Sequence, residues 1–270
     1  MRTPRLTVLW IAIGLTAAAP GRAAELEPRT AAAFDRYVAA SEAQRDMPGP
    51  FLWLDEETPP RKEDRARVRG GGLLIERLET RDNGRPIPVP GGLIHHWLGT
   101  VFIPGATLQD TVRLLQDYDR HGEIYRPNVA QARLLNRDGD RFRIHLRFFM
   151  KRVITVVVNS EHDAVFTRHG PGQVSSRIAS VRIAEVENPG LPQERELPVG
   201  RDGGYLWRLN SYWRLVERDG GVYVQCESIS LTRGIPFGLG WIVGPFVTSI
   251  PRETLTFTLE TTRSTLSARR

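Results

Sequence analysis

The strongest constraint on the fold of this chain is a series of alternating apolar and polar segments, each ended by a turn signal. The segments are residues 129–136, 141–149, 153–168, 174–187, 205–217 and 222–232. Asp138-Gly139 separates the first two segments and Asp219-Gly220 the last two. An Asp-Gly pair between two alternating segments is typical of a β-hairpin. The pattern therefore predicts an antiparallel meander.

Helical signals flank this meander on both sides. Residues 93–103 read as a first strand, after which Thr107 caps a helix that runs to Tyr118, and a short helical turn follows over 119–125. After the meander, Ser249 as cap and Pro251 at the first position indicate a closing helix. The order predicts an α+β fold in which a curved antiparallel sheet wraps around a long C-terminal helix.

Residues 24–90 have fewer regular signals than residues 91–268. A helix is expected over 28–46 and a short strand over 73–78, while the signal is weak in the charged, Pro-containing stretch 56–69. So few apolar positions would give a marginal independent core. We expect an N-terminal extension packed on a main domain of residues 91–268.

The first 23 residues resemble a secretory signal peptide. Two positive charges precede the apolar stretch 6–19, and small residues follow at Gly21, Ala23 and Ala24. Cleavage after Ala23 or after Ala19 fits this pattern. The alternative is an uncleaved anchor, but the apolar stretch is shorter than the roughly 20 residues that span a bilayer. We expect an exported protein, periplasmic or secreted.

Composition and motifs exclude several classes of function. The formal charge is +6, and because Arg2, Arg5 and Arg22 lie in the leader, the remainder carries half of that excess, which does not indicate nucleic-acid binding. The single cysteine, Cys226, excludes an intramolecular disulfide. The sequence has no motif of the common hydrolases, zinc proteases or nucleotide enzymes. No cofactor is implied.

A metal site is not expected either. His95-His96 is the most suggestive histidine pair, but neighbouring side chains on a strand point to opposite faces and cannot share one ion.

Two stretches resemble the START-like (SRPBCC) superfamily. One is DYDRHGEIYRPNV at residues 117–129, followed by LLNRDGD at 134–140, and the other is IPFGLGW at 235–241, leading into IPRE at 250–253. The resemblance covers about residues 91–268. It implies a helix-grip fold with a cavity between sheet and helix, which in that superfamily usually holds a lipid, sterol, quinone or polyketide-like molecule.

Strand alternation predicts which side chains line such a cavity. One face of the last hairpin combines large indoles with small hydroxyl and thiol groups, which suits a mostly apolar ligand. With the apolar positions of other elements, the predicted cavity residues are Phe102, Leu146, Phe148, Trp207, Leu209, Ser211, Trp213, Cys226, Ser228, Trp241 and Phe246. Each of these aromatic side chains could instead simply fill the core.

The opposite face of that hairpin is polar. A two-residue turn at Asp219-Gly220 would place Tyr212 opposite Glu227. The predicted polar network consists of Arg182, Glu185, Arg208, Tyr212, Arg214 and Glu227. We interpret it mainly as a structural ion-pair lattice, which the N-terminal extension could cover. An acid–base role is the alternative.

A basic segment runs from Arg133 to Arg152. Arg141, Arg143 and Arg147 share one strand face with His145, which predicts a solvated face or a patch for transient contact with an anionic membrane. The apolar, glycine-containing stretch 236–250 could then act as a gate at the mouth of the cavity.

Three functions remain open at this point. The first is an exported carrier of a hydrophobic small molecule. The second is an enzyme of the cyclase or aromatase kind without a metal, and the third is an interaction module with a vestigial cavity.

Overall fold

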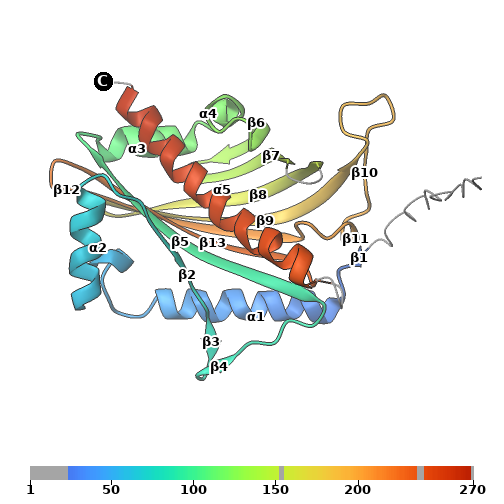
Figure 1. Ribbon diagram of the computed structural model, residues 1–270. Helices are drawn as coiled ribbons and strands as arrows, with labels where there is room; N and C mark the ends of the chain where they lie inside the picture. The colour runs from blue at the N-terminus through green and yellow to red at the C-terminus, as the bar shows by residue number, and fades with distance from the viewer. Residues whose placement is uncertain (1–23, 152–154, 236–239, 269–270) are drawn as a thin grey trace, which may run out of the picture.

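A single large antiparallel sheet organises the molecule (Figure 1). The computed structural model describes residues 24–151, 155–235 and 240–268, with side chains in the last range from residue 249 onward. The sheet strands are β2 (Leu74–Arg77), β5 (Gly92–Pro104), β6 (Val129–Asp138), β7 (Arg141–Lys151), β8 (Thr155–Gly170), β9 (Gln173–Glu187), β10 (Arg195–Glu196), β12 (Arg208–Arg218) and β13 (Gly221–Arg233).

The chain crosses the sheet once and then returns strand by strand. The order is β2-β5-β13-β12-β9-β8-β7-β6, with β10 paired to β9. Helix α3 (Leu108–Gln116), the short helix η2 (Tyr118–Arg120) and α4 (His121–Ile124) carry the chain from β5 to the far edge at β6. The meander then brings β13 back beside β5. The strands predicted from alternation are confirmed to within a few residues at each end.

The turn and cap signals act as predicted. Asp219 and Gly220 both have positive φ, as a two-residue turn of type I′ requires, and Tyr212 pairs with Glu227 across the hairpin. Thr107 Oγ1 accepts a hydrogen bond from the Asp110 amide at 3.1 Å and caps α3. Local chemistry thus determines both the register of the last hairpin and the start of α3.

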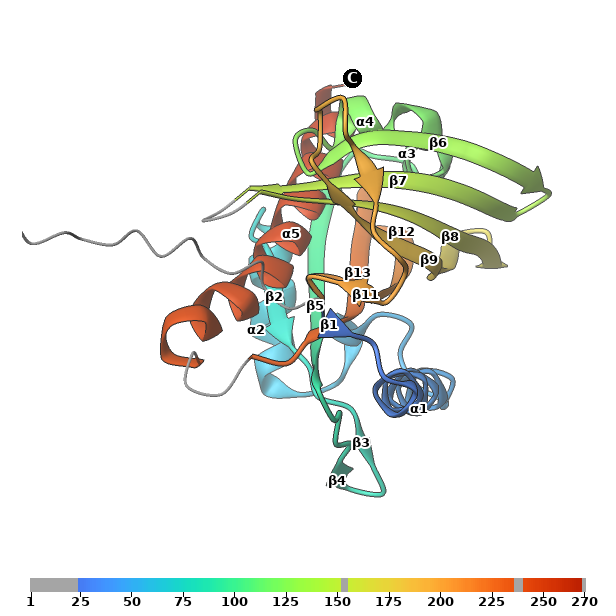
Figure 2. The ribbon, with the colours of Figure 1, turned by 90° about the vertical axis from the view of Figure 1, so that its right-hand side faces the viewer.

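Helix α5 (Gly240–Ala268) lies across one face of the sheet (Figures 1 and 2). Leu255 and Leu259 pack with Val101 and other inward side chains of the sheet, and α3 joins the same core. The predicted α+β helix-grip fold is confirmed. The predicted start of the closing helix at Ser249 and Pro251 is wrong, because α5 already begins at Gly240. Pro251 lies inside the helix. It has no backbone N–H, so the helix lacks one of its backbone hydrogen bonds at this position.

Helix α1 (Pro28–Arg45) and the segment around residues 51–55 pack on the sheet face opposite α5, whereas Leu73 and Ile75, in and beside β2, pack against the core that α5 shares (Figure 2). Helix α1, predicted over 28–46, packs Phe34 and Tyr37 against Ile229 and Leu231 of β13. A second cluster joins Leu52 and Leu54, in and beside helix η1 (Trp53–Asp55), to Phe102, Val216 and Tyr223 of the sheet. Both clusters are shared between the extension and the sheet.

The stretch 56–69, to which the sequence pattern assigns no element, contains helix α2 (Pro59–Arg69). Its signal is weak in the sequence because Val68 is its only buried side chain. Arg61 connects the helix to its neighbours. It pairs with Asp64 at 2.8 Å and with Glu76 of β2 at 2.7 Å. Its guanidinium also stacks on the Trp53 ring. β2, the predicted strand 73–78, becomes the edge of the large sheet.

Two small two-stranded sheets complete the described chain. β1 (Ala24–Glu25) pairs with β11 (Arg201–Asp202), and β3 (Arg81–Asp82) pairs with β4 (Arg85–Pro86). The predicted signal peptide, residues 1–23, lies outside the described residues. No helix in the described part of the chain is both long and apolar enough to span a membrane.

Candidate ligand-binding cavity

An apolar cavity of about 140 Å³ lies between the sheet and the helices of the crossover and of α5. On the helical side it is lined by Leu115, Tyr118, His121, Tyr125 and Thr258. On the sheet side the walls come from the inward faces of β6 to β9 and β12. None of the described lining residues is Asp, Glu, Lys or Arg. The cavity interior therefore suits a mostly apolar, uncharged molecule.

The short helices after α3 provide the aromatic end of the cavity. Tyr118, His121 and Tyr125 follow helical spacing, and the His121 ring lies 5.0 Å from each tyrosine ring, measured between centroids. The Leu134 amide donates to Asp119 at 2.8 Å and so ties this turn to β6. Tyr125 Oη lies 3.0 Å from Thr262 Oγ1 of α5. These contacts hold the three rings against the core.

The titratable groups of the cavity are neutral at ordinary pH. Burial lowers the pKa of His121 and of His162 to about 4. Burial also raises the pKa of Tyr125 to about 12 and raises that of Tyr118. In each case desolvation disfavours the charged form of the side chain.

Three polar atoms of residues that line the cavity are buried without a hydrogen-bond partner in the described part of the chain. They are Tyr118 Oη, His162 Nδ1 and Ser176 Oγ. The three side chains come from η2, β8 and β9. Buried polar atoms normally have a protein or water partner, and each exception calls for an explanation. The three residues line one cavity but these atoms are covered by neighbouring side chains, so a bound molecule would gain polar contacts with them by displacing those neighbours.

Part of the predicted cavity set lies in this lining. Leu146 and Phe148 of β7 and Leu209, Ser211 and Trp213 of β12 all line the cavity. Their inward positions follow from strand alternation, as predicted. The structure therefore places these five residues of β7 and β12 together at the wall of one cavity.

Four other predicted residues do not reach the lining or cannot be placed. Cys226 faces the core beside α5, where burial raises the pKa of its thiol, and Ser228 is half-buried opposite Ser211. Both lie on β13, beyond the strands that line the cavity. The side chains of Trp241 and Phe246 lie outside the part of the chain that the structure describes. The same holds for most of the predicted gate 236–250.

The cavity assignments of Phe102 and Trp207 are wrong. Phe102 lies between Val101 and Ile103, which face α5, so its own side chain points the other way and its ring packs 4.6 Å from that of Tyr223. Trp207 precedes the first residue of β12, where strand alternation does not apply. Its indole donates to Asp202 at 3.0 Å and packs with α1.

The polar face of the last hairpin is covered by α1, as the sequence suggested. Arg45 of α1 donates to both carboxylate oxygens of Glu227, at 2.7 and 3.1 Å, and His96 Nε2 lies 2.8 Å from the same carboxylate. Burial alone would raise the pKa of Glu227, but the hydrogen bonds from His96 and Arg45 lower it to about 2. Tyr212 donates to Glu42 at 2.8 Å. This cluster joins α1 to the sheet and does not line the cavity.

The rest of the predicted network does not assemble. Arg182 and Glu185 are three residues apart on β9 and so lie on different faces. Arg182 pairs with Glu196, whereas Glu185 accepts from the Gly203 amide at 2.8 Å. Arg208 donates to the Trp207 carbonyl. Arg214 donates to the Phe51 and Arg45 carbonyls. The expected lattice is thus replaced by contacts to the extension and to nearby loops.

The predicted basic face of β7 is partly neutralised. Arg143 pairs with Asp163 at 2.6 Å and Arg147 pairs with Glu194 at 2.9 Å. His95 and His96 have different surroundings, as predicted: His95 Nε2 lies 3.1 Å from Thr232 Oγ1, far from the Glu227 cluster of His96. No three potential ligand side chains gather into a metal site among the described residues.

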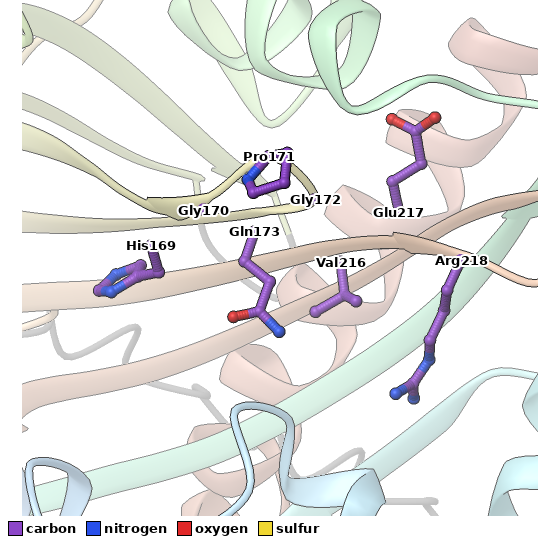
Figure 3. Close-up of a pocket in the computed structure, with 8 residues that line it drawn as sticks. All are labelled: His169, Gly170, Pro171, Gly172, Gln173, Val216, Glu217 and Arg218. Carbon is purple, nitrogen blue, oxygen red and sulfur yellow. The ribbon is translucent and has the colours of Figure 1, made fainter.

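A second hollow, of about 350 Å³, opens at the turn between β8 and β9 (Figure 3). Glu217 points to one side of β12 while Val216 and Arg218 point to the other (Figure 3). Glu217 already accepts from the Leu108 amide at 2.6 Å, and Arg218 donates to Asp55 at 2.5 Å. The charged groups of this hollow hold α3 and the extension in place.

The lining residues Tyr118, His121, His162 and Ser176 are not among those predicted from the sequence. The inward face of β8 could have been identified from Ala164 and Phe166, two and four residues after His162. Tyr118 could not be assigned in this way, because its position depends on how the crossover packs.

No family model matches the chain, and no curated protein matches its sequence. Similar solved structures include the STAR-related lipid transfer protein from Xanthomonas axonopodis, 20% identical over 71% of this chain and 98% of that chain, with a TM-score of 0.47. The Zhui aromatase/cyclase from Streptomyces sp. R1128 is 13% identical over 66% and 96%, with a TM-score of 0.38. A START superfamily protein from Mycobacterium smegmatis is 11% identical over 66% and 99%, with a TM-score of 0.40. The helix-grip arrangement itself is seen directly in this chain, in the antiparallel sheet and α5.

Proposed function

We propose that this protein is an exported binding or carrier protein for a hydrophobic small molecule, held without covalent chemistry in the cavity between the sheet and α5. One observation carries the proposal: an uncharged apolar cavity whose lining residues include three buried, unpartnered polar atoms. Sites for small molecules have this composition, with mainly apolar walls and a few polar groups that orient the ligand.

The size of the cavity limits how binding proceeds. Its volume of about 140 Å³ is below the roughly 300–1,000 Å³ typical of sites for drug-sized ligands. A small ring system fits more readily than a lipid tail. A larger ligand enters only if the sheet and the helices move apart.

The proposed export rests on the leader sequence. Cleavage after Ala19 or Ala23 would leave β1 intact, because that strand begins at Ala24. The mass of the protein recovered from outside the cytoplasm distinguishes the two sites. Recovery of only the full-length chain inside the cells would contradict export.

Ligand binding can be tested with Nile red, an uncharged dye whose emission rises in apolar surroundings. The dye is larger than the closed cavity, so its binding also reports whether the sheet and the helices move apart to admit a larger ligand. We expect the protein to enhance the emission in a saturable manner and Ser176→Leu to abolish this, because leucine would fill the cavity. Ser175→Leu is the matched control, since Ser175 precedes Ser176 on β9 and contacts His169 at the surface instead. Unsaturable emission, or equal binding by both variants and the parent, would contradict the proposal.

Native mass spectrometry of protein purified from its natural source provides a second measurement. A discrete added mass that is released by organic extraction supports the carrier. An empty protein that also fails to bind Nile red would favour an interaction module.

A further inference from the structure

The hydrogen bonds around His162 determine which of its ring nitrogens carries the proton. Ser160 Oγ donates its single hydrogen to the Leu146 carbonyl at 3.1 Å. His162 Nε2 lies 2.9 Å from the same Ser160 Oγ, so Nε2 must supply the hydrogen of that contact. The network therefore assigns the proton of the neutral ring to Nε2.

His162 Nδ1 is then a lone-pair acceptor. The side chain is 1% exposed, and burial keeps the ring neutral by lowering its pKa to about 4, with His145 lowering it further and Asp163 opposing this. The ring is held edge-on to Phe148, with centroids 6.2 Å apart. No donor reaches Nδ1 within the described residues. A buried acceptor left in this state costs free energy, which a bound donor would recover.

The other two unpartnered atoms are less restrictive. Tyr118 Oη and Ser176 Oγ belong to hydroxyl groups, each of which can donate or accept. Only His162 Nδ1 requires a donor from the ligand. Because the described lining has no charged side chain, that donor must belong to an uncharged group.

On the basis of the proposed function, we infer that the ligand is a neutral molecule with a hydroxyl group, an alcohol or phenol, that donates to His162 Nδ1. Such a group can also accept from Tyr118 or Ser176. A carboxylate or phosphate would be buried as an unpaired charge. Quinone and ester oxygens only accept, and would leave Nδ1 unsatisfied.

Displacement of Nile red by matched compounds tests this inference. 4-Octylphenol and 4-octylanisole have the same tail and ring, but the methyl ether cannot donate. We expect the phenol to bind about tenfold more tightly, the effect of one buried hydrogen bond. We expect 4-octylbenzoate to bind weakly because of its charge. Equal affinity of phenol and anisole would overturn the inference.

Two variants assign the preference to the ring nitrogen. His162→Phe keeps a flat ring without an acceptor, so we expect the phenol preference to disappear while Nile red still binds. Ser160→Ala removes the acceptor that keeps the proton on Nε2. We therefore expect the ratio of phenol affinity to anisole affinity to fall in this variant. His145→Phe, on the outer face of β7, should leave it unchanged. A preference that persists in His162→Phe would also overturn the inference.

The readouts separate this inference from the proposed function. If the parent protein shows no saturable Nile red binding, the proposal that the cavity is a binding site is contradicted. Retained Nile red binding without a preference for the phenol contradicts only the hydroxyl ligand.

Discussion

The buried contact between Arg45 and Glu227 should be a large contributor to the docking of α1, and Arg45→Met tests this. The Arg45 side chain is 14% exposed and that of Glu227 is 10% exposed, so both charges are largely removed from water. The guanidinium also lies 3.6 Å from the centre of the Tyr212 ring. Methionine keeps most of the apolar stem but leaves the carboxylate without its main partner.

Breaking a buried ion pair from one side typically costs about 3–5 kcal/mol. Because His96 and Ser41 still contact Glu227, we place the loss at the lower end, about 3 kcal/mol. For a chain of this size that corresponds to a fall in Tm of about 6–12 °C. Urea unfolding and differential scanning calorimetry at pH 7 measure the two quantities.

Arg201→Met is the matched control for this experiment. Arg201 pairs with Glu25, but the two side chains are 69% and 63% exposed, so the change should stay within about 0.5 kcal/mol. The double variant Arg45→Met with Glu227→Gln should recover part of the stability, because no charge remains buried. A loss below 1 kcal/mol for Arg45→Met, or one equal to that of the control, would refute the reasoning.

Three further predictions concern packing, capping and pH. Gly99→Ala should cost about 1–3 kcal/mol in urea unfolding, because a Cβ there would lie 2.4 Å from Leu259 of α5; an unchanged midpoint would show that α5 can shift. Thr107→Ala should cost about 1 kcal/mol by losing the cap of α3, and Thr107→Ser should restore most of it. Stability should fall as the pH drops from 6.5 towards 4, by about 2 kcal/mol at pH 5 for each histidine that is buried neutral, because the unfolded chain binds protons in this window and the folded chain does not. Equal urea midpoints at pH 7 and pH 5 would contradict that expectation for His95, His121 and His162.

Local chemistry made much of the fold predictable. The Asp219-Gly220 turn determines the register of the last hairpin, and Thr107 determines the start of α3. The alternation in β7 correctly places Phe148 inward and Arg147 outward. These features depend on residues that are close in sequence or directly opposite on paired strands.

The cavity was less predictable because long-range packing decides it. Phe102 and Val101 are both apolar, and the sequence does not show that β5 separates two cores. Val101 faces the core that contains α5, and Phe102 faces the core that contains the extension. The β8 and β9 strands shift register between Glu161 and His162, which reverses the alternation of one strand relative to the other. Tyr118 enters the cavity through the path of the crossover. Sequence periodicity contains none of this information.

The unequal covering of the sheet has a mechanical consequence. The strands β5 and β13 are held between α5 and the extension, with large apolar side chains or the Arg45–Glu227 pair on both faces, so this half of the sheet resists bending. The outer face of β6 to β8 instead carries Arg143, Asp163 and other side chains that face solvent. Because the cavity lies largely against these thinly covered strands, its volume can change through their deflection while the clamped half keeps its shape. The layer formed by residues 24–90 thus makes the half of the sheet that it covers stiffer than the half beside the cavity.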